Sequence, residues 1–188
     1  MVSKNQIAVL ILVVVLGLPA FATDAPAGLE DVPKEMLRQS VLSDHNGKFE
    51  IGIPNLNVHW YRGIQTKYPT YAAVNQAARR VYTVGYFPKE SGDTLEQTVQ
   101  GAFAGVRRWA AQNKAVVQNT ASELSDIPYP KSRRLHAEGK FANGTPFYAV
   151  QYIVVTDAII CNVGTYALNQ SDVQDFAEFV SSFRVMKY

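Results

Sequence analysis

Apolar and polar residues alternate in several short segments of the chain, which is the pattern of half-buried strands. The first of these segments places Phe49, Ile51 and Ile53 on one face and polar or small residues on the other. Three segments in the first half of the chain predict strands: 48–54 (KFEIGIP), 58–62 (VHWYR) and 81–87 (VYTVGYF). A further segment, residues 68–78, has the character of both a loop and a helix.

Three more strands are predicted close together in the second half, at residues 134–141, 147–155 and 158–168. Asn143-Gly144, between the first two, is the strongest short signal for a hairpin. The last two strands are apolar on nearly both faces, so we expect the sheet to be covered on both sides. The prolines around residue 128 predict a loop over residues 119–131.

The clearest helix follows the third strand. Asp93 is predicted as its N-cap, with Glu96 three residues on in a capping box, and the helix is expected to end near Asn113. An apolar stripe runs along it at spacings of four and three residues. The stripe consists of Leu95, Val99, Phe103, Val106 and Ala110.

A second helix is predicted at the C-terminus. Ser171 is its expected cap, with Gln174 three residues on, and acidic residues such as Asp172 occupy the first turns, where the helix dipole favours them. A short helix is also predicted over residues 31–42, with Pro33 near its first position. We therefore expect an α+β fold, a central antiparallel sheet with helices packed on its faces.

The first 22 residues form a separate segment. Lys4 is followed by an uninterrupted apolar run over residues 7–18, then Pro19 and a small-x-small site that ends at Ala22. These features are typical of a signal peptide cleaved between Ala22 and Thr23, and a retained membrane anchor is the alternative. The expected organisation is a signal peptide (1–22), a leader with a short helix (23–47) and a single α+β domain (48–188).

The composition of the chain excludes one class of function, nucleic-acid binding. The chain has 188 residues, and its formal net charge of +2 is too small for a nucleic-acid-binding surface. Lys4 is the one charged residue of the signal peptide, so the chain without it has 17 Lys and Arg residues and 16 Asp and Glu residues. We expect a periplasmic or secreted protein that has no membrane span after cleavage and does not bind nucleic acid.

Two parts of this pattern resemble the PsbP-like α/β/α sandwich proteins. The segment 49–54 (FEIGIP), followed by His59-Trp60, is similar to the F-x-I-x-x-P … W opening of that group. The closing segment 180–184 (VSSFR) is similar to its "SF" terminus. The group includes the photosystem II extrinsic subunit and periplasmic DcrB-like proteins. The resemblance implies the sandwich fold and a binding or assembly role rather than catalysis.

Residues that could carry chemistry are scattered. His45, His59 and His136 have no metal-ligand spacing, and we expect no metal site and no cofactor. The single cysteine, Cys161, lies in an apolar strand, so we expect it to be buried and inert rather than a nucleophile served by His136. The sequence thus predicts no catalytic residues.

Tyrosines offer the best guess at a binding site, because Tyr is enriched in binding surfaces. Tyr68 and Tyr71 lie in the segment of mixed character and are the candidate binding residues. The favoured function is an exported, non-catalytic binding or accessory protein, whose partner is an unknown protein or small molecule of the envelope. The alternative is a small periplasmic hydrolase or transferase, which would need a cleft with converging titratable groups.

Overall fold

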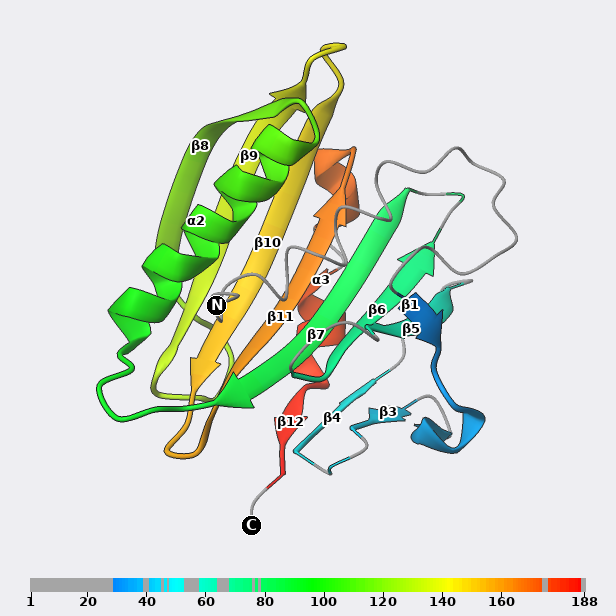
Figure 1. The fold of residues 1–188 in the computed structure, drawn as a ribbon, viewed down its shortest axis with the longest axis vertical. Coiled ribbons are helices and arrows are strands. Elements are labelled where there is room, and N and C mark those ends of the chain that lie inside the picture. The colour runs from blue at the N-terminus through cyan, green and yellow to red at the C-terminus, as the bar shows by residue number, and fades with distance from the viewer. Residues whose placement is uncertain are drawn as a thin grey trace.

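The computed structural model describes residues 29–38, 41–44, 46, 48–52, 58–63, 68–75, 77, 79–173 and 176–186. An eight-stranded antiparallel sheet, in the order β1-β5-β6-β7-β11-β10-β9-β8, dominates these residues (Figure 1). Its strands are β1 (Leu29–Asp31), β5 (His59–Gly63), β6 (Thr70–Asn75), β7 (Arg80–Pro88), β8 (Ala115–Leu124), β9 (Ser132–Phe141), β10 (Pro146–Val155) and β11 (Ile159–Ala167).

One face of this sheet is covered by the long helix α2 (Leu95–Gln112), which lies across β8, β9 and β10 (Figure 1). Its Val99 and Phe103 pack against Ile153 and Ile160, while its Trp109 packs against Phe147. Successive residues of a strand point to opposite faces, so the odd-numbered residues of β10 belong to the α2 face.

The opposite face carries a second layer. It contains the six-residue helix α3 (Phe176–Ser181), the 3-10 turn η3 (Gln170–Val173) and a small four-stranded sheet in the order β12-β4-β3-β2 (Figure 1). The strands of the small sheet are β2 (Leu37–Arg38), β3 (Val41–Ser43), β4 (Phe49–Gly52) and β12 (Arg184–Val185). The main core lies between this layer and the large sheet, and Phe49, Tyr152 and Phe176 are among its members.

The predicted fold class is confirmed, because helices pack on both faces of a central antiparallel sheet. The cover expected on both sides of β10 and β11 is also present, since nearly every residue of these strands is buried. The Asn143-Gly144 hairpin is confirmed as well, with Gly144 at φ +82° and β9 paired to β10. The signal peptide and its cleavage site, Ala22-Thr23, lie outside the described residues.

Three local predictions were wrong. Residues 31–42 do not form the predicted helix: of those that the structure describes (31–38, 41 and 42), only the 3-10 turn η2 (Lys34–Met36) is helical, and strands β1, β2 and β3 surround it. Residues 119–124 are not a loop but the second half of β8. Ser171 does not cap α3, because it lies inside the separate turn η3.

The start of α2 is displaced by one residue from the prediction. The N-cap is Thr94, whose hydroxyl accepts a hydrogen bond from the Gln97 backbone N–H, while the Gln97 side chain accepts one from the Thr94 backbone. The predicted Asp93 instead accepts a hydrogen bond from the backbone N–H of Glu90 in the preceding turn. Among the described residues, no helix is both long and apolar enough to cross a membrane.

Candidate functional site

Strands β8 and β9 present a polar surface on the side of the sheet opposite α2. Leu135 and Ala137 of β9 point toward α2 and are buried, so the residues between them point the other way. The strand register places β8 residues of the same face beside them. We call this surface the polar face; it consists of Asn119, Glu123, Arg134, His136, Glu138 and Lys140.

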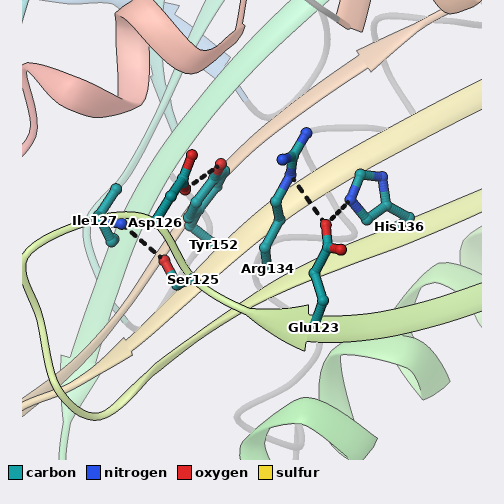
Figure 2. A network of polar contacts seen from close by, with 7 residues as sticks. All are labelled: Glu123, Ser125, Asp126, Ile127, Arg134, His136 and Tyr152. Carbon is teal, nitrogen blue, oxygen red and sulfur yellow. Dashed lines mark hydrogen bonds and ion pairs between the residues drawn. The ribbon is translucent and has the colours of Figure 1, made fainter.

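Glu123 contacts two other residues of the polar face, Arg134 and His136 (Figure 2). One oxygen of its carboxylate, Oε1, lies 2.7 Å from His136 Nε2 and 3.5 Å from Arg134 Nε. Cross-strand pairing sets this arrangement, because Glu123 is opposite Arg134 and Ala121 is opposite His136. The side chains of His136 and Glu123 are 37% and 54% exposed, so a partner in solution can reach both.

A second pair of groups lies beside this cluster. The hydroxyl of Tyr152 donates a 2.9 Å hydrogen bond to Asp126 Oδ1, just beyond the end of β8 (Figure 2). The guanidinium of Arg134 lies 5.9 Å from the centre of the Tyr152 ring, a cation–π contact. Burial, followed by the hydrogen bond to Asp126, raises the pKa of Tyr152. The tyrosine therefore stays protonated at neutral pH, with Arg134 in contact with its ring.

The rest of the polar face continues along β9. The Asn119 side-chain amide donates to the Glu138 carboxylate, while Lys140 extends into solvent opposite Val116. The surface therefore carries both acids and bases along two neighbouring strands. Such a surface fits a polar partner of mixed charge better than a strongly anionic or cationic one.

Among the described residues, the cross-strand neighbours of His136 supply no nucleophile. A histidine oriented by a carboxylate can act as a base, but it needs a nucleophile or a substrate-binding cleft beside it. His136 has Ala121 on one side and Val150 on the other as its cross-strand neighbours, and neither has a polar side chain. A cavity between α2 and the sheet has a volume of only about 10 Å³, enough for one water.

The predicted binding residues lie at the other half of the sheet. Tyr71 belongs to β6 and is buried, and its hydroxyl donates a 2.7 Å hydrogen bond to Asp44 Oδ1. Tyr68 is half-buried just before β6, with its ring 6.3 Å from that of Phe87. Tyr71 therefore already has a structural role, and a shared ligand for the two tyrosines stays a prediction.

Cys161 is buried, as the sequence indicates. Burial, assisted by the nearby Asp44 carboxylate, raises the pKa of its thiol to about 12. Strand β10 separates it from His136 on β9. A thiolate served by this histidine is therefore not supported by the geometry.

Two other polar residues have partners that the sequence did not reveal. His59 lies on the surface of β5, and its Nε2 is 2.8 Å from Asp31 Oδ1. Asp172, predicted in the first turns of the C-terminal helix, accepts a 2.8 Å hydrogen bond from the buried Arg80. Within the described part of the chain, no group of three or more His, Cys, Asp or Glu side chains could hold a metal ion.

The sequence missed the part of the polar face that lies on β8. The alternation of residues 134–141 indicated that Arg134, His136, Glu138 and Lys140 share a face of β9. Glu123, however, lay in a predicted loop, so nothing placed its carboxylate beside them. No local pattern marks residues 116–124 as a strand, because their side chains are mostly exposed on both faces.

Comparison with solved structures identifies the fold. Cyanobacterial PsbP (CyanoP) from Synechocystis sp. PCC 6803 is similar, with a TM-score of 0.54 and 15% identity over 90% of this chain and 99% of that one. A protein from Bacteroides thetaiotaomicron VPI-5482 is similar with a TM-score of 0.50 and 11% identity over 79% of this chain, which spans 48% of that protein's length. No protein-family model matches the sequence, and the search of curated proteins finds no significant match. The chain therefore has a PsbP-like α+β fold.

Proposed function

We propose that this protein is an exported accessory or assembly protein that binds a partner through the polar face and performs no catalysis. The PsbP-like fold supports this class of function, in line with the sequence resemblance. The observation that carries the proposal is the ordered cluster of Glu123, Arg134 and His136 on an open strand surface. We also propose that the protein is related to the periplasmic DcrB-like proteins, which the sequence motifs resemble.

The partner is proposed to be an envelope protein rather than a small molecule. The groups of the polar face are spread along two extended strands and carry both signs of charge, as in the polar parts of many protein interfaces. Association through such exposed charges should weaken as salt rises.

Binding is preferred to the hydrolase or transferase alternative because the reactive side chains are held protonated. Burial raises the pKa of Cys161, Tyr152 and Tyr166, so none of them supplies an anion near neutral pH. The side chains of Glu123 and His136 are exposed, so water would compete with a substrate there.

Export is proposed to require residues 1–22. The mature chain would then begin at Thr23, which leaves residues 23–28 ahead of β1. Mass spectrometry of the protein recovered from the envelope or medium tests this step. A mature chain that begins at Met1 would favour the retained anchor instead.

The chain provides a matched control for the binding experiment. His59 and Asp31 form an exposed histidine–carboxylate pair at the opposite end of the sheet, with a 2.8 Å separation close to the 2.7 Å of His136 and Glu123. We expect His136→Ala with Glu123→Gln to abolish capture of the partner from the native envelope fraction. His59→Ala with Asp31→Asn should leave capture unchanged.

Three results decide the proposal. The proposal is supported if a protein captured by the unaltered chain is lost with the His136→Ala, Glu123→Gln variant and kept with the His59→Ala, Asp31→Asn variant. Weaker capture by the unaltered chain at higher salt would support it further. Equal capture by both double variants would place the interface elsewhere. Turnover of an ester, phosphoester or glycoside substrate that depends on His136 would favour the hydrolase alternative.

A further inference from the structure

Strand β8 leaves one long backbone edge open. It is the last strand of the large sheet, and in the part of the chain that the structure describes it pairs only with β9 (Figure 1). Such an edge presents a row of backbone N–H and C=O groups that only another extended strand can pair. The edge is accessible, because most side chains of this ten-residue strand are exposed.

The two edges of the sheet differ in how they are protected against further pairing. Natural edge strands avoid association by being short, or by carrying charges, prolines or bulges. Strand β1, at the other edge, has three residues, two of which are Glu30 and Asp31. In β8, residues 115–122 (AVVQNTAS) contain neither a charge nor a proline. A bulge between Val117 and Asn119 is its one irregularity of pairing.

Exposed aliphatic side chains mark the same strand. The large hydrophobic residues with more than a third of their surface exposed, among the described residues, are Val116 at 69%, Leu124 at 79% and Met186 at 38%. The two most exposed lie at the two ends of β8. Contact with a partner strand would remove apolar surface from water at both ends.

The charges next to and within β8 favour an antiparallel partner of the same sequence. Lys114 immediately precedes the strand, and Lys140 lies opposite its second residue, Val116. Glu123 lies at its other end, where it also keeps its contacts with Arg134 and His136 on the inner strand. A two-fold axis near the middle of β8 would bring the lysine end of one copy to the Glu123 end of the other.

We propose that a second copy of this chain pairs with β8 in antiparallel fashion, so that the two large sheets join edge to edge. The inference goes beyond the proposed function and does not depend on it. The interface uses the backbone edge of β8 and, at its two ends, Lys140 and Glu123 of the polar face, whereas the proposed accessory role uses the cluster of Glu123, Arg134 and His136. A monomeric protein would overturn the dimer and leave the accessory role to its own test.

Sedimentation velocity over a dilution series tests the dimer on the chain as purified from the producing cell. We expect a dimer that dissociates on dilution. Thr120→Lys places a charge near the two-fold axis, where the two introduced lysines would face each other, and should weaken the dimer at least about tenfold. Ala104→Lys adds the same charge on the exposed side of α2 and should leave it intact. A monomer at every concentration, or a dimer unaffected by Thr120→Lys, would overturn the proposal.

Cross-linking gives a second measurement that does not depend on weakening the protein. The native Cys161 is buried, so an introduced surface cysteine is the reactive one. Thr120→Cys near the axis should form an intermolecular disulfide under mild oxidation, and it should do so faster than Ala104→Cys. Equal rates for the two variants would show that β8 is not the interface. Circular dichroism confirms that each variant is folded.

Discussion

The Cys161 side chain lies in β11 with none of its surface exposed. Because burial raises the pKa of the thiol to about 12, the folded chain holds a protonated, shielded sulfur at pH 8. We expect iodoacetamide to leave the native protein unlabelled at pH 8 and to label it quickly in urea. An Ala104→Cys variant should gain one label in the native state. Rapid labelling of Cys161 without denaturant would contradict the burial.

The same raised pKa sets a direction for the pH dependence of stability. Below about pH 9, the ordinary value, the thiol is protonated in both the folded and the unfolded chain, and its contribution is constant. Between about 9 and about 12 only the unfolded chain ionises, so the free energy of unfolding should fall. Cys161→Ala should reduce the alkaline slope measured by urea unfolding, although buried tyrosines retain part of it.

Gly139 is required by close packing between β9 and its neighbours. A Cβ there would lie 2.1 Å from the Val116 carbonyl oxygen on β8 and 2.6 Å from Phe147 Cε1 on β10. The backbone of β8 cannot give way without losing its pairing with β9. We therefore expect Gly139→Ala to lower the free energy of unfolding by about 2 kcal/mol or more in denaturant titrations.

Gly144 provides the control for this substitution. It has a positive φ of +82° at the hairpin, but an added Cβ would have no neighbour within 4 Å. Gly144→Ala should therefore lose only about 1 kcal/mol, which reflects backbone strain alone. An equal loss at both glycines would mean that β8 yields easily at Gly139.

Among the elements, α2 shows how far a local pattern determines a boundary. The apolar stripe placed the helix correctly, but the sequence offers two overlapping capping boxes, at Asp93/Glu96 and Thr94/Gln97. Asp93 is held in the preceding turn by the Glu90 N–H, and Thr94 is therefore the cap. The hydrogen bond in the preceding turn therefore determines which residue caps the helix, and the capping motif alone does not.

Substitution at the two possible cap sites tests this assignment. Thr94→Ala removes the hydroxyl that accepts from Gln97 and should cost about 1 kcal/mol in thermal or denaturant unfolding. Glu96→Ala removes the side chain that an Asp93 capping box would need and should cost only a few tenths of a kcal/mol, through the lost charge at the helix N-terminus. A larger loss for Glu96→Ala than for Thr94→Ala would favour the Asp93 cap.

The sequence pattern did not predict strand β8, and the reason is physical. Strands are recognised from alternation that reflects one buried face, but residues 116–124 are mostly exposed on both faces. Strand β6 was left undecided for the opposite reason, since its first five residues are all buried and alternation is absent. Backbone pairing with β7 and with β9, the next strands along the chain, decides both elements.

At the scale of the whole molecule, the sequence predicted the main layers but not the small sheet formed by β2, β3, β4 and β12. Cover on both sides of β10 and β11 followed from their apolar runs, and it is provided by α2 on one face and α3 on the other. The small sheet depends on Arg184 and Val185 pairing with Glu50 and Phe49, a contact across nearly the whole described chain. No local pattern encodes such a pairing.

The two tryptophans of the chain report on the two faces of the large sheet separately. Trp60 lies in the core shared with α3 and the small sheet, whereas Trp109 lies in the cluster under α2. Each is at least 95% buried, and the strands between them belong to one hydrogen-bonded sheet. Because neither layer can leave without exposing a face of the sheet they share, the two should unfold together.

Single-tryptophan variants measure this cooperativity. Trp60→Phe leaves fluorescence from the α2 side, and Trp109→Phe leaves it from the α3 side. Each variant should lose stability because a large buried ring shrinks, by about 1–3 kcal/mol. Within each variant, we expect the fluorescence midpoint to coincide with that of far-ultraviolet circular dichroism in urea. If Trp109 reported an earlier transition than the circular dichroism of the same variant, α2 and its strands would form a unit that unfolds independently of the small sheet, and the single domain predicted from the sequence would be wrong.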